Sequence, residues 1–226
     1  MKRILAIETS AETCSVALEY DGEVRESFEH APMKHAELIL PAVNALLDAA
    51  GVRTPDLDAI AFGRGPGSFT SLRIGIGVVQ GLAWGADIPV VPVSSLAAVA
   101  QGVLDGVADD SRILVAMDAR MGEVFHGEFV KGPGGTVAAA GEEGVSAPGD
   151  LSMAGPWIAA GNGFERFEAL AGLAREAIFC RPDAWPRASA VLQLAHAWLL
   201  GHEALPAGMA QPVYIRNNVA ERPAGA

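Results

Sequence analysis

One pattern occurs twice in this chain, and it limits the possible folds more than any other feature of the sequence. Each copy starts with four apolar residues, 4–7 or 113–116, and soon reaches an acidic residue, Glu8 or Asp118, so that the two copies lie about 110 residues apart. A short turn, a second alternating strand and a glycine-containing turn follow in both copies. A supersecondary unit used twice predicts two lobes of similar plan.

Hydrophobic periodicity predicts an α/β chain whose first half has the order βββαβαβα. The expected strands of this half are 4–7, 15–20, 24–28, 58–62 and 88–93, and its expected helices are 35–50, 70–84 and 96–104. In the second half we expect strands at 113–116, 123–130, near 137, 157–160 and 178–179, helices at 164–175 and 187–202, and a loop over 138–156. We place a first lobe at 1–108 and a smaller second lobe at 109–211, and expect the tail 212–226 to pack back on the first lobe.

The charge balance argues against some classes of partner. The 226 residues carry 27 acidic and 16 basic side chains, a formal charge of -11, and three of the basic residues are lysines. Since nucleic-acid affinity comes largely from lysine and arginine on phosphates, we do not expect the chain to bind tRNA or DNA by itself. We expect neither a signal peptide nor a membrane span from its short apolar runs, and two cysteines provide no disulfide framework. A cytoplasmic protein with no membrane partner is the expectation.

A duplicated βββαβα plan with an acid after each first strand is typical of the RNase H-like lobes of the actin, Hsp70 and sugar-kinase (ASKHA) superfamily. This analogy predicts a cleft between the lobes, edged by Glu8, Thr9, Ser10 and Asp118. In such a cleft a carboxylate orients magnesium or water beside phosphates. Each acid could equally cap the turn after its strand, and the residues alone leave both interpretations open.

The most distinctive segment is a glycine-rich loop ahead of an expected helix, formed by Arg64, Gly65, Pro66, Gly67 and Ser68. Backbone N–H groups and a guanidinium in such a loop can bind an anion. It is not a Walker A loop, because no Gly-Lys-Ser/Thr follows. A tight strand-to-helix crossover in which proline fixes φ explains the same residues, so both interpretations stay open.

Three glycines at four-residue spacing, Gly77, Gly81 and Gly85, lie along the helix that begins near residue 70. Each glycine inside a helix costs about 1 kcal/mol relative to alanine. Close approach of another backbone would offset this cost. The approaching backbone could belong to the same lobe or to another subunit.

No pattern in the sequence supports a catalytic or metal-binding role for the histidines, serines and cysteines. The five histidines include no pair at i, i+4 spacing for a metal ion, and the chain has no Gly-x-Ser-x-Gly nucleophile elbow. Cys14 lies in a strand pattern and is expected to be a small core residue. We therefore predict no metal site and no catalytic residue.

Five stretches of the sequence form a combination with a known counterpart. They are 4–10, 35–41, 63–75, 118–124 and 212–218, and the most specific are Gly-Arg-Gly-Pro-Gly-Ser-Phe-Thr at 63–70 and Asp-Ala-Arg-Met-Gly-Glu at 118–123. Together they resemble the bacterial TsaB family, formerly called YeaZ, which is related to the TsaD/Kae1 family. The resemblance runs from the first strand nearly to the C-terminus and is loose in the middle of the second lobe.

The resemblance implies a non-catalytic subunit that binds a TsaD homologue together with the ATPase TsaE. Such a subunit is required for transfer of the threonylcarbamoyl group to an adenosine of tRNA, and tRNA is bound only through the complex. The catalytic relative carries a His-x-x-x-His metal pair after the strand that corresponds to 88–93. Here the stretch 94–99 reads Ser-Ser-Leu-Ala-Ala-Val and lacks both histidines. The cleft would then be vestigial, and no cofactor is expected.

The resemblance also implies a partner surface, in which helices 35–50 and 70–84 pair with the equivalent helices of TsaD. The residues expected at this surface are Leu38, Pro41, Val43, Leu46, Arg73, Gly77, Val78 and Gly81. A chain without its partner could close the same surface by forming a homodimer. The alternative function is of another class: an ATP-dependent small-molecule phosphotransferase of the ASKHA superfamily that uses Glu8 and Asp118 around magnesium-ATP.

Overall fold

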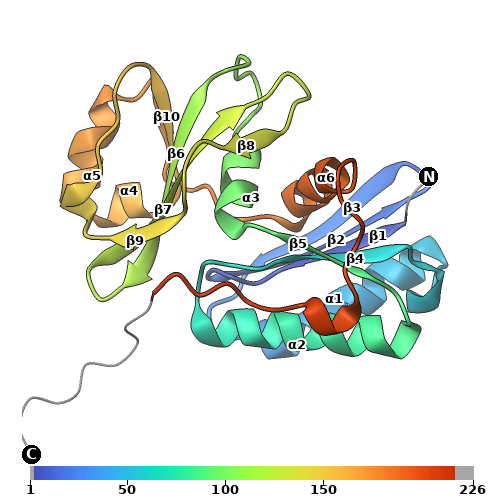
Figure 1. Ribbon diagram of the computed structural model, residues 1–226. Coiled ribbons are helices and arrows are strands. Elements are labelled where there is room, and N and C mark those ends of the chain that lie inside the picture. Colours follow the sequence, from blue (N-terminus) through green and yellow to red (C-terminus); the bar gives the residue numbers. More distant parts are fainter. Residues whose placement is uncertain (1–2, 217–226) are drawn as a thin grey trace, which may run out of the picture.

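The computed structural model describes residues 3–216, and its first half forms a five-stranded sheet (Figure 1). The strands are β1 (Ile4–Glu8), β2 (Thr13–Tyr20), β3 (Glu23–His30), β4 (Ala59–Gly63) and β5 (Val90–Val93). Their order is β3-β2-β1-β4-β5, in which the first three strands of the chain are antiparallel and β4 and β5 extend the sheet in parallel. Every residue of β1 is buried, because helices cover both faces of the sheet.

Three helices complete the predicted order βββαβαβα, which is confirmed. α1 (His35–Ala50) and α2 (Phe69–Ala86) contact each other and share one apolar core with the first sheet. α1 has the predicted bounds and ends at Gly51, whose left-handed φ of 68° caps the helix. α3 (Ser95–Gln101) starts after Ser94, whose hydroxyl accepts the Ala97 N–H at 3.1 Å, and it ends earlier than expected.

The second half repeats the strand order of the first. Its elements are β6 (Arg112–Arg120), β7 (Glu123–Lys131), β8 (Val137–Ala139), β9 (Gly144–Ser146), β10 (Trp157–Ala160), α4 (Gly163–Arg166), α5 (Glu168–Leu173), β11 (Phe179–Arg181) and α6 (Ala188–Trp198). The sheet order β11-β10-β6-β7-β8 is that of the first sheet read from the other end, with β9 added beside β7. The duplicated α/β fold class is therefore confirmed.

Two local predictions for the second half were wrong. The helix expected over 164–175 is interrupted at Phe167, which has extended backbone angles and separates α4 from α5. The loop expected over 138–156 contains the end of β8 and the whole of β9. In this described stretch no helix takes the place that α1 has in the first half, so the second copy lacks one helix of the plan.

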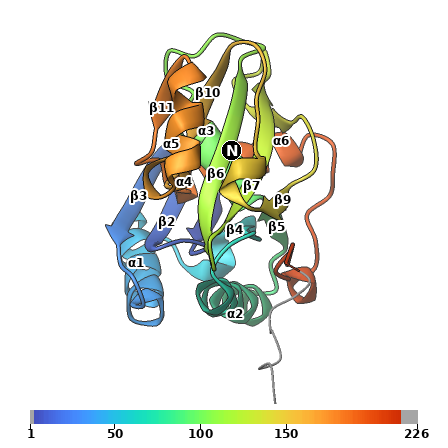
Figure 2. The same ribbon diagram turned by 90° about the vertical axis from the view of Figure 1, so that its left-hand side faces the viewer.

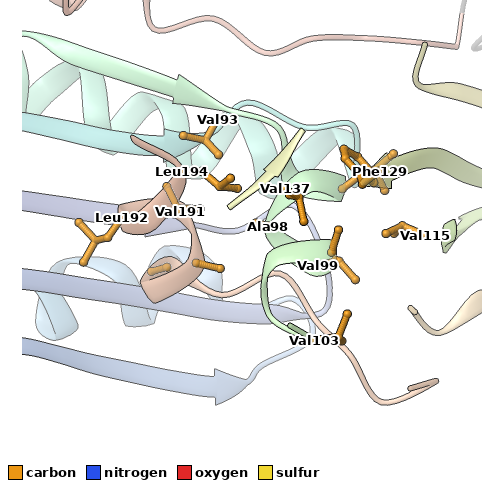
Figure 3. Packing of buried hydrophobic residues seen from close by; sticks show 14 of the residues in the cluster. Val93, Ala98, Val99, Val103, Val115, Phe129, Val137, Val191, Leu192 and Leu194 are labelled. Atoms are coloured by element: carbon orange, nitrogen blue, oxygen red, sulfur yellow. The ribbon is translucent and has the colours of Figure 1, made fainter. Parts of the chain in front are cut away.

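The last helix of each half packs against the sheet of the other half. α6 contacts β1, β2, β4 and β5, whereas α3 contacts β6, β7 and β8, and the two helices also contact each other. Figure 3 shows their side chains, such as Leu192 and Val99, in one apolar cluster that also includes Val115 of the second sheet. We expected the 187–202 helix within the second lobe, and the structure corrects this placement. The lobe boundary between residues 108 and 109 remains a proposal, and it applies to the two sheets but not to α3 and α6.

The layers follow from these contacts. Figures 1 and 2 show α1 and α2 on the outer side of the first sheet, α3 and α6 between the sheets, and α4 and α5 outside the second sheet. After α6 the chain returns along α2, where the Gln80 side chain donates to the Ala210 carbonyl at 2.7 Å. The Val213 N–H then donates to the Arg64 carbonyl at 2.8 Å, whereas the Arg216 guanidinium binds Glu123 of the second lobe. The described part of the tail, 212–216, therefore contacts both lobes and not the first lobe alone. The rest of the predicted tail, 217–226, lies outside the described residues.

Candidate functional site

Glu8 ends β1 and points into the protein. It is 0% exposed, and its two carboxyl oxygens accept hydrogen bonds from the Ser10 N–H at 2.6 Å and the Ser95 hydroxyl at 2.8 Å. A Cβ on Gly63, in the neighbouring strand, would lie 1.8 Å from Glu8 Oε2, so this glycine makes room for the carboxyl group. Burial raises the pKa of Glu8, against hydrogen bonds that lower it. Glu8 therefore links β1 to the start of α3.

Thr9 and Ser10 are also engaged within the chain. The Thr9 hydroxyl donates to the Ser71 carbonyl at 3.0 Å, and a Cβ on Gly75 would lie 2.1 Å from Thr9 Oγ1. A Cβ on Gly67 would lie 2.3 Å from the Ser10 carbonyl oxygen. Glycine at both positions lets the loop and α2 approach the end of β1 closely.

The glycine-rich loop uses its backbone donors inside the protein. The N–H groups of Arg64, Gly65 and Ser68 donate to acceptors elsewhere in the chain at 2.8, 3.2 and 2.7 Å, and the Gly65–Pro66 peptide bond is cis. The Arg64 guanidinium lies 3.9 Å from Glu143 in the second lobe. These contacts favour the interpretation of a tight crossover over that of an anion site.

Asp118 near the end of β6 belongs to a network of charges that joins the lobes. Its Oδ2 binds the Arg166 guanidinium, and its Oδ1 accepts the Arg120 N–H at 2.8 Å. Glu12 reaches from the first lobe and binds the same two arginines, with a distance of 3.0 Å to Arg166. The Asp118 charge is therefore already compensated, and the pairs join the turn before β2 to the end of β6 and to α4.

A cavity of about 400 Å³ lies between the lobes, next to this network. Among the residues that line it are Ser10, Ser68, Phe69, Asp118, Arg120 and Tyr214. Of the four predicted cleft residues, Ser10 and Asp118 therefore line the cavity, whereas Glu8 and Thr9 lie behind its wall. Magnesium-ATP would need a free carboxylate at this cavity, and the arrangement does not fit it because Glu8 is buried and Asp118 is paired.

Two serines, Ser94 and Ser95, begin the stretch 94–99, in which the resemblance implied a histidine pair for the catalytic relative. Ser95 binds Glu8, and Ser94 both caps α3 and donates to Glu143. Within residues 3–216, no three His, Cys, Asp or Glu side chains are grouped so that they could hold a metal ion. No helix in this part of the chain is long and apolar enough to cross a membrane.

The outer face of α2 is open. Gly77, Gly81 and Gly85 are exposed, and a Cβ on any of them would meet no atom of the described chain within 4 Å. Packing inside the lobe therefore does not explain these three glycines, although it explains Gly75. Whether another subunit packs on them stays a prediction.

The other predicted partner residues differ in their exposure. Those at least partly exposed on α1 and α2 are Leu38, Pro41, Leu46, Arg73 and Val78. Val43 is 0% exposed and packs in the core beneath α1, so its assignment to the partner surface is wrong. It belongs to the i, i+4 series with Ile39 and Leu47, which forms the buried face of the helix.

Two groups of residues were missed in the sequence. Phe69 and Trp84, 47% and 73% exposed, lie on the same helix as the open glycines, and their spacing on one helical face was a usable signal. Glu12, Arg166 and Ser95 were also missed. No local pattern indicates their roles, since Arg166 lies 154 residues from Glu12 in the chain, and Ser95 lies 87 residues from Glu8.

The chain is similar in sequence to known proteins. A family model described as TsaD, tRNA N6-adenosine threonylcarbamoyltransferase, matches residues 28–179. The tRNA threonylcarbamoyladenosine biosynthesis protein TsaB of Escherichia coli is 40% identical over 228 residues, covering 96% of each chain. The TsaB protein of Haemophilus influenzae is 46% identical over 128 residues, which is 57% of this chain and 54% of that protein.

A solved structure extends the match to three dimensions. YeaZ from Pseudomonas aeruginosa has a TM-score of 0.86 and 41% identity, covering 95% of this chain and 100% of that one. Both the sequence and the fold therefore match over nearly the whole chain. The chain belongs to the TsaB (YeaZ) family of tRNA threonylcarbamoyladenosine biosynthesis proteins.

Proposed function

We propose that this chain is a non-catalytic subunit that binds a TsaD homologue and, with a TsaE homologue, is required for transfer of the threonylcarbamoyl group to adenosine of tRNA. The observation that carries the proposal is the open glycine face of α2. Gly77, Gly81 and Gly85 are exposed within the described chain and contact none of its own elements, although each costs about 1 kcal/mol relative to alanine in a helix. A partner helix packed closely against this face would offset that cost.

The interlobe cavity supports an accessory role. Glu8 is buried, Asp118 is paired with two arginines, and Ser94 and Ser95 stand where a metal ligand was expected. The phosphotransferase alternative needs free carboxylates around magnesium-ATP, and the described residues of the site offer none in this arrangement. With a formal charge of -11, the chain would leave tRNA binding to the complex. We also propose a cytoplasmic location, because the proposed complex acts on tRNA.

Reconstitution tests the proposal directly. TsaD and TsaE homologues, supplied with threonylcarbamoyl-adenylate and tRNA, should form modified adenosine when this chain is present and lose that activity when it is omitted. The readout is the modified nucleoside, quantified by mass spectrometry. Equal modification without the chain would refute the requirement, and robust ATP hydrolysis or magnesium-ATP binding by the chain alone would support the phosphotransferase.

A glycine variant tests the surface. Gly77→Leu should abolish co-elution with the TsaD homologue while leaving the melting temperature largely unchanged, because a Cβ there meets no atom of the described chain within 4 Å. Gly172→Leu is the matched control, since this exposed glycine lies in α5 of the second lobe and also has an open Cβ position. If both variants co-elute like the wild type, the interface assignment fails. If the isolated chain forms a homodimer through the same face, Gly77→Leu should also make it monomeric in light scattering.

A further inference from the structure

Arg73 is held in one position on the outer face of α2. Its guanidinium carbon lies 3.7 Å from the centre of the Phe69 ring, and its Nε donates to the Tyr214 hydroxyl at 2.9 Å. The Phe69 and Tyr214 rings lie 5.4 Å apart and are tilted by 33°. Because the guanidinium stacks on the Phe69 ring and is hydrogen-bonded at Nε, the side chain has already lost much of the conformational entropy that binding would remove.

The terminal nitrogens of this guanidinium remain available. Arg73 is the single charged residue in the sequence of α2. Within residues 3–216, no carboxylate lies within 4.0 Å of it, and its one hydrogen bond to the described chain is the one to Tyr214. Two N–H donors in a rigid fork match a carboxylate in bidentate geometry.

Two large side chains on α2, Arg73 and Trp84, stand on either side of open glycines. Arg73 and Trp84 are eleven residues apart and share one helical face, so they lie about 16 Å apart along the axis. Gly77 and Gly81 lie between them and are open, while Trp84 is 73% exposed. A helix with its side chains is about 10–12 Å wide and therefore fits between the two large residues.

We propose that Arg73 is the electrostatic anchor of the partner surface: it binds, in bidentate geometry, the carboxylate of an acidic residue on a partner helix that lies across Gly77 and Gly81. The proposal rests on the proposed function, which supplies a TsaD homologue as the partner. A protein carboxylate is favoured over an RNA phosphate because Arg73 is an isolated positive charge on a chain with a net charge of -11, whereas RNA binding needs clustered basic residues.

Binding of the TsaD homologue, measured by calorimetry with the full chain at 150 and 500 mM salt, tests the anchor. Arg73→Ala should weaken binding about 30-fold at the lower salt, as expected when a hydrogen-bonded charge pair loses one member. Arg73→Lys should recover only part of this loss, because lysine keeps the charge but not the fork. Tyr214→Phe, which removes the hydroxyl that holds Nε, should weaken binding about fivefold.

Arg175→Ala is the matched control, since Arg175 is exposed in the second lobe and has no carboxylate within 4.0 Å in the described chain. It should bind like the wild type. Added salt should weaken the wild type more than Arg73→Ala. A charge reversal, Arg73→Glu, should be rescued by replacing the matching partner acid with arginine, which a merely structural role of Arg73 would not produce.

The outcomes separate the anchor from the proposed function. If the wild type does not bind the TsaD homologue, the proposed function fails. If the wild type binds and Gly77→Leu blocks binding while Arg73→Ala has no effect, the interface stands and the anchor is refuted. If Arg73→Ala instead weakens retention of tRNA by the chain alone and leaves the TsaD homologue bound, Arg73 binds phosphate, and the carboxylate proposal is overturned.

Discussion

Glu8 and Asp118 occupy corresponding places in the two lobes, yet their surroundings are opposite. Glu8 fits against Gly63 and binds Ser95, so that its carboxyl group is sealed in the core. Asp118 lines the interlobe cavity and is compensated by guanidinium groups such as that of Arg166. A repeated topology therefore fixes where an acid stands in the chain, whereas its neighbours decide whether the carboxyl group is buried or pairs with charged side chains.

The outer layers of the lobes differ in the same way. The first lobe presents two long helices, α1 and α2, whereas the second presents the short helices α4 and α5 and lacks a counterpart of α1 in its described residues. Exposed glycines follow one another along α2. The two copies of one plan therefore differ most in their outer helices, and the proposed docking surface on α2 depends on this difference.

The largest effect should come from closing the space that Glu8 occupies. Gly63→Ala should lower the free energy of unfolding by about 3 kcal/mol, because the new Cβ would overlap a carboxyl group that is hydrogen-bonded at both oxygens. Gly77→Ala, at an open helical position, should instead raise it by about 1 kcal/mol. Urea unfolding followed by circular dichroism measures both. Similar values for the two variants would show that Glu8 is not tightly enclosed.

The next effect compares the two acids directly. Glu8→Ala should lower the free energy of unfolding by about 2 kcal/mol, because the buried Ser10 N–H and Ser95 hydroxyl lose their acceptor. Asp118→Ala should cost about 1 kcal/mol or less, since Arg166 keeps its pair with Glu12 at the protein surface. The same urea experiment applies. An Asp118 variant that is the less stable of the two would reverse the assignment of roles.

The pH dependence of stability tests the burial of the Glu8 carboxyl group. Burial raises the pKa of Glu8 above its ordinary value of 4.5, so the folded state holds a proton that the unfolded state has lost. The stabilisation from this proton is complete below pH 4.5 and is lost as the pH rises through the folded pKa. The stability of the wild type relative to Glu8→Gln should therefore be highest below pH 4.5 and fall above it. If the stability of the wild type relative to Glu8→Gln grew with pH, this would contradict a buried site that favours the protonated carboxyl group.

The smallest effect concerns the charge network between the lobes. Glu12→Gln should lower the free energy of unfolding by less than about 1 kcal/mol, because its arginine partners are 67% and 36% exposed. It should also speed hydrogen exchange in the turn between β6 and β7, which Glu12 holds through Arg120. Glu23→Gln is the control, because Glu23 pairs with Arg25 inside one strand. Equal exchange in both variants would show that the network does not restrain the lobes.

Much of the fold was predictable because hydrophobic periods are local. The order of elements in the first half, the bounds of α1 and the duplication of the strand plan were all visible in the sequence. The burial of Val43 was also within reach, since it follows Ile39 at the spacing of one buried helical face. The interruption at Phe167 was not, because nothing in its immediate sequence breaks a helix.

The candidate site was less predictable, since its contacts join distant parts of the chain. The acids after the first strands were found by their place in the repeat, but their partners were not. Ser95 lies 87 residues from Glu8, and Arg166 lies 154 residues from Glu12. Periodicity describes which face of an element is apolar, and it does not describe which element will cover that face.

The sequence by itself therefore determined the two copies of the strand plan, the position of an acid in each, the glycine spacing of α2 and the absence of the histidine pair at 94–99. Only the tertiary structure decided that Glu8 turns inward, that α3 and α6 each cover the opposite sheet, and that the outer glycines stay open. The physical reason is the distance along the chain over which each effect acts. Local spacing sets the backbone and the apolar face of each element, whereas burial and charge pairing depend on which distant segments meet when the chain closes.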